Sequence, residues 1–338
     1  MGGNIARFLV TGGAGYIGSH VVGTLLRNNH EVVVLDKGLY GFHALDEFKR
    51  SASLRILKGD IRIREDIEGA LDGVEGVVHL AGLVGNPACL WNRNVAWDSN
   101  VGGTKMLLEC IASRSKPINY FLFASSCSVY GYGVETFNEK SVPNPVDFYA
   151  QTKLQSEKDI YDSALSCSVA IMRFATVFGM SKRMRFDLAV NGMMLAAQRS
   201  GLAHVYGGTQ ERPFICCKDI GDAVFCILSG MDGASSIEIY NVGDDRLNYT
   251  LSKVGEKVVE RVPHSELEIE EGSSDKRSYR VSFSKLASLG FCPTVSLEDG
   301  IEAIYGALES RVICSPHSAI YSNYETARLA YEKRSTRE

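Results

Sequence analysis

The sequence predicts an α/β fold in which a doubly wound parallel sheet is followed by a smaller C-terminal α+β lobe. Three observations lead to this fold class. In the first half of the chain, short apolar runs alternate with segments of helical periodicity, which is typical of βαβ units. Several runs are apolar at every position, as in strands that are covered on both faces of a sheet. A glycine-rich segment at residues 11–18 separates the first run from the first helical segment, where this architecture binds ligands.

The elements of the first half follow one another in a regular order. The run Arg7-Phe8-Leu9-Val10 predicts the first strand, and apolar residues between 17 and 26 recur on one face of the first helix. Further strands are expected at 31–35, 54–57, 76–80, 120–123 and 169–172, and further helices at 65–71, 94–113 and 149–164. Because crossovers between parallel strands are right-handed, this order gives an open, doubly wound sheet of the Rossmann type.

After about residue 178 the regular alternation is lost, and short strands mix with helices. Helices are expected at 188–199 and 220–228, and strands at 203–206, 237–240 and 266–270. We therefore divide the chain into a Rossmann domain at 1–178, a smaller α+β lobe at 179–310 and a partly helical C-terminal tail at 311–338. Within the lobe, a segment near 214–230 is expected to return to the sheet.

The composition excludes several classes of protein. The 338 residues include 36 basic and 40 acidic side chains, for a formal charge of −4. This balance argues against a nucleic-acid partner and against an anionic membrane surface. No stretch approaches the ~20 apolar residues of a bilayer span, and the N-terminus lacks the pattern of a signal peptide. The nine cysteines include no CxxC pair, so we expect reduced thiols in a cytoplasmic protein and no metal site.

The segment TGGAGYIG at 11–18 predicts a phosphate-binding loop. Its glycines let the backbone approach a pyrophosphate, whose charge then meets the amide groups at a helix N-terminus. Asp36 ends the second expected strand, 18 residues after Gly18, and its carboxylate can accept hydrogen bonds from both ribose hydroxyls. That charge repels a 2′-phosphate, so NAD is favoured over NADP, although the neighbouring Lys37 weakens the preference slightly. Taken alone, the glycines are equally consistent with a tight turn that needs positive φ.

A second constellation predicts proton transfer. Tyr149 and Lys153 lie at i and i+4 of an expected helix, so the phenol and the ammonium share one face. The preceding strand ends in the serine cluster at 125–128, at the sheet edge where ligands of this architecture bind. Lowering a tyrosine pKa from ~10 to about 7 requires about 4 kcal/mol, which a lysine ammonium and a positive nicotinamide ring can supply together. A serine hydroxyl can orient the alcohol, although a serine loop can also bind its own backbone.

Taken in this order, the motifs resemble those of the extended short-chain dehydrogenase/reductase family. The motifs are TGGAGYIG at 11–18, Asp36, GDI at 59–61, HLAG at 79–82, NVGGT at 100–104, SSCSVYG at 125–131 and YxxxK at 149–153. Within this family, residues from about 6 to 305 resemble the nucleotide-sugar epimerases and dehydratases. The resemblance implies NAD as cofactor and Ser126, Tyr149 and Lys153 as the catalytic triad. The implied cofactor-binding residues are Gly12, Gly15, Tyr16, Ile17, Gly18, Asp36, Lys37, Asp60, Ile61, Leu80, Ala81, Gly82, Asn100, Tyr149 and Lys153.

The second half contains segments that resemble the family's contacts to a nucleotide diphosphate. Arg212 lies in GGTQERPF at 207–214, and Arg277 lies in DKRSY at 275–279. A planar guanidinium suits bidentate contact with phosphate. The basic cluster at 182–185 is also a candidate to face the nucleotide, although a solvated charge run is the commoner outcome. The expected substrate-binding residues are Val84, Ser128, Thr176, Asn191, Arg212 and Arg277.

The residues after the triad serine narrow the reaction that the resemblance implies. The family's 4,6-dehydratases have two acidic residues there, whereas this chain has Cys127 and Ser128. We therefore expect an NAD-dependent nucleotide-sugar 4-epimerase, in which the first domain binds NAD and the lobe at 179–310 binds the nucleotide sugar. The alternatives are a 4-dehydrogenase, a 4,6-dehydratase and a non-catalytic NAD-binding protein. The helices near 94–113 and 149–164 resemble the family's dimer-forming pair, so a homodimer is expected.

Overall fold

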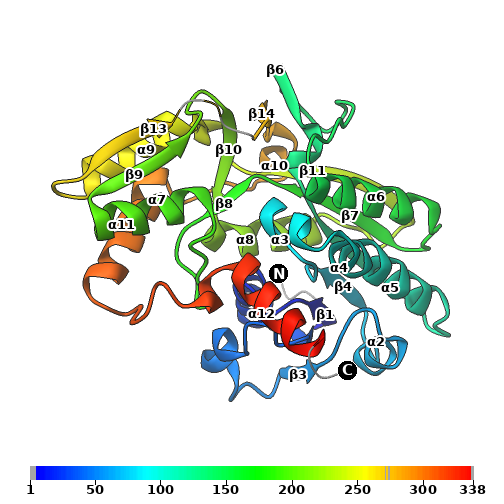
Figure 1. Ribbon diagram of the computed structural model, residues 1–338. Helices are drawn as coiled ribbons and strands as arrows, with labels where there is room; N and C mark the ends of the chain where they lie inside the picture. Colours follow the sequence, from blue (N-terminus) through cyan, green and yellow to red (C-terminus); the bar gives the residue numbers. More distant parts are fainter. Residues whose placement is uncertain (1–4, 271, 273–274, 336–338) are drawn as a thin grey trace.

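A parallel sheet of seven strands forms the centre of the molecule, in the order β11-β7-β5-β4-β1-β2-β3 (Figure 1). The structure is a computed structural model that describes residues 5–270, 272 and 275–335. The strands of this sheet are β1 (Arg7–Thr11), β2 (Glu31–Asp36), β3 (Leu54–Lys58), β4 (Gly76–His79), β5 (Tyr120–Ser126), β7 (Ser168–Phe174) and β11 (Ser236–Val242). The predicted Rossmann-type α/β fold is confirmed.

Helices cover both faces of the sheet, which explains why its central strands are apolar at every position. One face packs against α1 (Gly18–Arg27) and α8 (Cys217–Ser229), and the other packs against α2 (Arg64–Ala70), α5 (Gly103–Ala112) and α6 (Phe148–Asp162). In β1, Phe8 and Val10 belong to the core on the first face, whereas Leu9 belongs to the core on the second. Successive residues of one strand therefore stabilise opposite layers.

A π-helical turn interrupts the helix that the sequence predicts at 94–113. Helix α4 (Arg93–Trp97) continues into the π-helical segment η2 (Asp98–Gly102) and then into α5. The carbonyl oxygen of Asn100 accepts hydrogen bonds from Thr104 Oγ1 at 2.6 Å and from Ser156 Oγ at 3.1 Å. Side chains of α5 and α6 thus hold the backbone of this turn, and such turns are frequent at functional sites.

A smaller lobe faces one end of the sheet and contains three small sheets, in the orders β12-β10-β8, β13-β9 and β14-β6. Their strands are β6 (Tyr132–Phe137), β8 (Thr176–Phe178), β9 (Leu202–Tyr206), β10 (Glu211–Cys216), β12 (Asn248–Thr250), β13 (Glu266–Glu270) and β14 (Ser278–Val281). The helices of this part are α7 (Ala189–Ser200), α9 (Leu251–Arg261), α10 (Ser284–Ser288) and α11 (Leu297–Glu309), with the 3₁₀ turn η4 (Asp245–Leu247). In the first domain, the 3₁₀ turns η1 (His43–Phe48) and η3 (Cys127–Tyr130) follow β2 and β5. Phe178, Met194 and Phe214 lie in the core of this lobe.

The chain returns to the central sheet over a longer segment than the expected 214–230. Helix α8 packs against α1, and β11 then pairs in parallel with the whole of β7. Ile237 and Ile239 of β11 pack against the core that α2, α5 and α6 cover. The expectation that residues 237–240 belong to the second lobe is therefore wrong, because strand periodicity does not reveal which sheet a strand joins. The remaining division of the chain stays a prediction.

The C-terminal tail contains the 3₁₀ turn η5 (Ala319–Tyr321) and helix α12 (Asn323–Ser335). Helix α12, red in Figure 1, contacts α3 (Asn86–Trp91), which follows β4. The tail therefore lies against the first domain, although it follows the second lobe in sequence. Residues 1–4 and 336–338, the ends of the predicted division, lie outside the described residues. None of the described helices is long and apolar enough to cross a membrane.

Candidate active site

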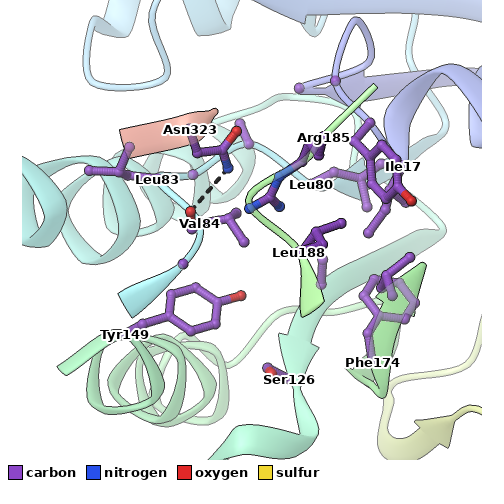
Figure 2. Close-up of a pocket in the computed structure, with 18 of the residues that line it drawn as sticks. Ile17, Leu80, Leu83, Val84, Ser126, Tyr149, Phe174, Arg185, Leu188 and Asn323 are labelled. Atoms are coloured by element: carbon purple, nitrogen blue, oxygen red, sulfur yellow. Dashed lines mark hydrogen bonds between the residues drawn. The ribbon is translucent and has the colours of Figure 1, made fainter. Parts of the chain in front are cut away.

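A cleft lies where the carboxyl ends of β1, β2, β4 and β5 face the second lobe (Figure 2). Both parts of the chain line it, as expected for an open α/β sheet. The sequence-predicted residues that line this cleft are Gly12, Gly15, Tyr16, Ile17, Gly18, Asp36, Lys37, Asp60, Ile61, Leu80, Ala81, Gly82, Val84, Ser126, Ser128, Tyr149, Lys153, Thr176, Arg212 and Arg277. Two other expected residues, Asn100 and Asn191, do not line it.

Two positions of the glycine loop cannot carry a side chain without displacing neighbouring backbone. Gly12 has a φ of +72°, and a Cβ there would lie 2.8 Å from the backbone nitrogen of Ala81. A Cβ at Gly18 would overlap the carbonyl oxygen of Gly12. Helix α1 begins at Gly18, so its N-terminal turn adjoins the loop at the cleft. This cradle fits the pyrophosphate of a dinucleotide, and NAD therefore fits the residues present.

Carboxylates lie at the ends of β2 and β3, where the adenosine of a dinucleotide would bind. Asp36 accepts hydrogen bonds from the amides of Ala14 at 3.1 Å and Gly38 at 2.8 Å. Burial raises the pKa of Asp36, and these two amides oppose that effect. Asp60 pairs with Arg62 at 2.6 Å and with Lys37 at 3.1 Å. Burial would raise the pKa of Asp60, but its two cationic partners outweigh burial and hold it well below its usual range.

Tyr149 and Lys153 lie one helical turn apart at the start of α6. Asp147 caps this helix by accepting a hydrogen bond from the amide of Ala150 at 2.8 Å, which fixes where the first turn begins. Lys153 Nζ lies 6.0 Å from the centre of the Tyr149 ring and donates a hydrogen bond to the carbonyl oxygen of Ala124 at 2.7 Å. Burial lowers the pKa of Lys153 to about 8 and raises the pKa of Tyr149.

The serine cluster at the end of β5 separates into different environments. Ser126 Oγ accepts hydrogen bonds from the amide of Ser128 at 3.2 Å and from its hydroxyl at 2.9 Å, at the edge of the cleft. Cys127 is fully buried, donates its Sγ–H to the carbonyl oxygen of Arg173 at 3.1 Å and does not line the cleft. Burial also raises the pKa of the Cys127 thiol. This cysteine therefore faces the core.

Two arginines of the second lobe meet at one carboxylate. Asp275 accepts hydrogen bonds from Arg277 Nε at 2.8 Å and Nη2 at 2.6 Å, and its Oδ2 pairs with Arg212 Nη2 at 3.0 Å. Burial would raise the pKa of Asp275, but the two arginines outweigh burial and lower it. Arg212 is 4% exposed, so this wall presents buried positive charge whose donors are shared with a carboxylate. Such donors suit a diphosphate.

Asn100 and Asn191 lie behind the lining of the cleft, where their side chains bond to other parts of the protein. The side chain of Asn100 bonds to both backbone groups of Leu83, at 2.7 and 3.0 Å, and to Thr152. Asn191 is fully buried and accepts from the amide of Gly179 at 3.0 Å, and it donates to Tyr16 and to the carbonyl of Arg185. The polar atoms of both amides are bonded within the protein, and Asn100 steadies the chain just after β4. A direct contact of either residue with cofactor or substrate stays a prediction.

A loop after β8 brings three charged residues to the cleft, of which Arg183 and Arg185 belong to the basic cluster that is a candidate to face the nucleotide and Asp187 was not among the expected site residues. Arg185 is bidentate to Asp187, at 2.9 and 3.0 Å, and Figure 2 shows it reaching into the cleft near Val84. Arg183 is 2% exposed, its guanidinium carbon lies 3.7 Å from the centre of the Tyr40 ring, and burial lowers its pKa to about 10. Arg183 Nε and Nη2 have no hydrogen-bond partner within the part of the chain that the structure describes. In the sequence, the basic run at 182–185 is the feature that indicates these two arginines.

Comparison with known proteins adds to this geometry. The family model described as "NAD dependent epimerase/dehydratase family" matches residues 8–243, and so does not extend to the tail. A UDP-glucuronate 4-epimerase of Thermodesulfobacterium geofontis is 26% identical over 311 residues, which is 87% of this chain and 94% of that protein.

Two solved structures share the fold. UDP-glucuronic acid 4-epimerase from Bacillus cereus, in complex with UDP-glucuronic acid and NAD, is 25% identical with a TM-score of 0.79. MoeE5, in complex with UDP-glucose and NAD, is 27% identical with a TM-score of 0.77. Each alignment covers 90% of this chain and 99% of the other.

Proposed function

Because the chain belongs to the NAD-dependent epimerase/dehydratase family, we propose that it is a nucleotide-sugar 4-epimerase that transiently oxidises and re-reduces the sugar at C4. The chain is an enzyme of the extended short-chain dehydrogenase/reductase type, and its cofactor is NAD. Two points are proposals: that the reaction takes place at C4 of the sugar, and that it leaves the sugar without net oxidation.

The observation that carries this proposal is the state of the carboxylates in the cleft. The described residues that line the cleft include four aspartates, Asp36, Asp60, Asp187 and Asp275. Asp36 accepts two backbone amides, and the other three pair with arginine or lysine. Elimination of water from the sugar needs a general acid or base in addition to the triad. In the 4,6-dehydratases that this chain resembles, two acidic residues follow the triad serine, whereas here Cys127 and Ser128 stand at those positions. The arrangement favours proton and hydride transfer at an alcohol carbon without elimination.

The triad supplies the proton transfer and orients the sugar. Tyr149 takes the proton of the C4 hydroxyl and later returns it, and Ser126 donates a hydrogen bond to the same oxygen. Burial opposes the phenolate of Tyr149, whereas the positive charges of Arg185 and Arg277 favour it and act to lower the pKa of Tyr149. NAD, when bound, supplies the hydride acceptor and donor together with a positively charged ring. Inversion then requires the 4-keto sugar to turn its other face before it is reduced.

A substrate screen tests this proposal. Purified protein is incubated with UDP-, GDP-, CDP- and dTDP-sugars, and the products are followed by NMR while NADH absorbance is recorded. The expected result is a C4 epimer that forms without net accumulation of NADH. A net ketone product with accumulating NADH would replace the 4-epimerase with a 4-dehydrogenase. Tight NAD binding without turnover of any nucleotide sugar would identify a non-catalytic NAD-binding protein.

We also propose that the protein is a cytoplasmic homodimer that pairs through the α4–α5 and α6 face. Trp97 of α4 is 41% exposed and Tyr161 of α6 is 47% exposed, so apolar surface lies on both helical segments. All nine cysteines are free thiols, as a reducing compartment would keep them. Size-exclusion chromatography with light scattering tests the dimer, and a monomeric mass would reject it.

A further inference from the structure

The C-terminal tail reaches the cleft although the second lobe separates it from the first domain in sequence. The carbonyl oxygen of Tyr321 accepts a hydrogen bond from the amide of Phe186 at 2.9 Å, and the two rings meet edge to face at 5.8 Å. Helix α12 begins two residues later. The tail is therefore attached to the same loop that carries Arg183 and Arg185.

An apolar contact then holds α12 next to the catalytic tyrosine. Ala327 is fully buried in a small cluster with Leu83, Ala88, Cys89 and Ala96, which come from the β4–α3 connection, α3 and α4. The rings of Tyr149 and Tyr324 pack against this cluster. Because Ala327 has no room around it, a larger side chain there would push the helix away.

At the sugar end of the cleft, the first residue of α12 lines the wall. Asn323 Nδ2 donates a hydrogen bond to the carbonyl oxygen of Val84 at 3.0 Å (Figure 2), and the Asn323 amide donates to Asp187 at 2.9 Å. The residue is 5% exposed and lines the cleft. Its Oδ1 is buried and has no hydrogen-bond partner among residues 5–270, 272 and 275–335. A buried amide oxygen without a donor is costly, and a hydroxyl or amide of a bound ligand would satisfy it.

At the adenosine end, two turns further along α12, Tyr331 lines the same cleft. Its hydroxyl accepts a hydrogen bond from Lys37 Nζ at 2.9 Å, and that ammonium lies 4.7 Å from the ring centre. Lys37 also pairs with Asp60, and the Tyr331 ring contacts Trp91 of α3 at 6.3 Å. The residues expected to hold adenosine are thus linked to the tail across the opening of the cleft.

We propose that Asn323 and Tyr331 are ligand-binding residues and that α12 forms the outer wall of the dinucleotide site. Tyr331 covers the adenosine half of NAD beside Lys37, and Asn323 accepts a hydrogen bond from the ligand at the Val84 side. NAD leaves only after α12 has moved away from α3. The purpose of this wall rests on the proposed function, since an epimerase must retain its cofactor until the hydride returns, whereas a dehydrogenase must exchange it in every cycle.

The experiment measures cofactor release without any sugar, so its outcome does not depend on epimerase activity. The protein is loaded with NADH, excess NAD is added, and the loss of bound-NADH fluorescence gives the dissociation rate. Ala327→Arg on the full chain displaces α12 and is expected to accelerate dissociation at least about tenfold. The matched control is Leu329→Arg, which adds the same charge to a 38% exposed position of the same helix and is expected to leave the rate unchanged.

A second variant keeps the test decisive if Ala327→Arg does not fold. Tyr331→Ala removes the contact with Lys37 and is expected to raise the NADH dissociation rate about threefold to tenfold. Tyr206→Ala, at a 59% exposed tyrosine outside the cleft, is its control. Asn323→Ala is expected to weaken binding of NAD or of the nucleotide sugar, and the two titrations identify which ligand its Oδ1 meets.

Limited cleavage at Glu325 by a glutamate-specific protease reports whether α12 has been displaced, and neither arginine substitution adds a site for this protease. Faster cleavage of Ala327→Arg together with an unchanged NADH dissociation rate would overturn the proposal. Unchanged dissociation from Tyr331→Ala would overturn it as well. Failure of the substrate screen would leave the dissociation rates unaffected, so the two failures are distinguishable.

Discussion

On the wall of the cleft that the Rossmann domain provides, the backbone satisfies key polar side chains: amides hold Asp36, and the carbonyl of Ala124 holds Lys153. On the facing wall, charged side chains satisfy one another. Arg185 pairs with Asp187, and Arg212 pairs with Asp275. Backbone groups are fixed by the loop and strand that carry them, whereas an ion pair can exchange its partner for a charged ligand. Asp36 and Lys153 are therefore fixed before ligands bind, whereas Arg185 and Arg212 share their charge with carboxylates until an anion competes for them.

The largest expected effect separates chemistry from binding. Tyr149→Phe removes the only group to which the proposed mechanism assigns proton transfer, so kcat is expected to fall about 10³-fold. NAD affinity is expected to fall far less than kcat, because the glycine loop and Asp36 remain. NMR detection of the C4 epimer measures the first quantity, and titration of the protein with NAD measures the second. Substantial activity in this variant would show that a residue other than Tyr149 transfers the proton, and the Rossmann wall would then not supply the proton transfer.

The next effect tests whether the backbone itself shapes the dinucleotide site. Gly12 and Gly233 have similar φ values, +72° and +79°, so alanine strains both backbones by about 1–2 kcal/mol. Only at Gly12 would the new Cβ meet a neighbour, the backbone of Ala81, whereas Gly233 has open space within 4 Å. Gly12→Ala is expected to weaken NAD binding about 100-fold, which corresponds to ~2.7 kcal/mol, and Gly233→Ala is expected to leave it unchanged.

Thermal melting and NAD titration of the two glycine variants separate strain from contact. Gly12→Ala is expected to lose more thermal stability than Gly233→Ala, because its Cβ also meets the Ala81 backbone. A difference in NAD affinity that exceeds this difference in stability supports a wall that is set by backbone geometry. Equal NAD affinities in the two variants would show that the Gly12 cradle does not hold the cofactor.

The two walls also differ in how far the sequence predicts them. The glycine loop, Asp36 and the Tyr149–Lys153 pair each lie within a few residues of an expected strand end or helix start, so local patterns bring them to the cleft. Their roles as NAD and sugar contacts stay predictions. Asn323 reaches the site only through tertiary packing of α12, which no local pattern encodes. The strand character of 237–240 was predictable, but its sheet was not, because the partner β7 is distant in sequence.

The fold can also use the polar side chains of the expected elements for hydrogen bonds within the protein. Asn191 lies in an expected helix near the site, and the structure uses its amide to join Gly179, Tyr16 and Arg185. The sequence shows that an asparagine is present. It does not show which backbone groups nearby in the fold lack a hydrogen-bond partner that the asparagine amide could supply. Residue type therefore predicts chemistry best where the backbone position is already known, as at the strand ends.

The smallest expected effect concerns the ion pairs of the second wall. Asp275→Asn removes the carboxylate that shares donors with Arg212 and Arg277, so those arginines become more available to a diphosphate. The KM for the nucleotide sugar is expected to fall about threefold to fivefold, in line with the modest worth of a charge-assisted hydrogen bond. Thermal stability is expected to fall as well, because Arg212 is buried and loses its counter-charge.

Glu211→Gln provides the matched control, because it changes the net charge equally and disturbs a pair with Arg280 that is more exposed. Its KM is expected to remain that of the unmodified protein, since neither residue lines the cleft. Steady-state kinetics at two ionic strengths measure both variants, and screening by salt is weak for a buried pair. A KM that rises in Asp275→Asn would mean that the carboxylate positions the arginines for the ligand. In that case the second wall, like the first, would be set before the ligand binds.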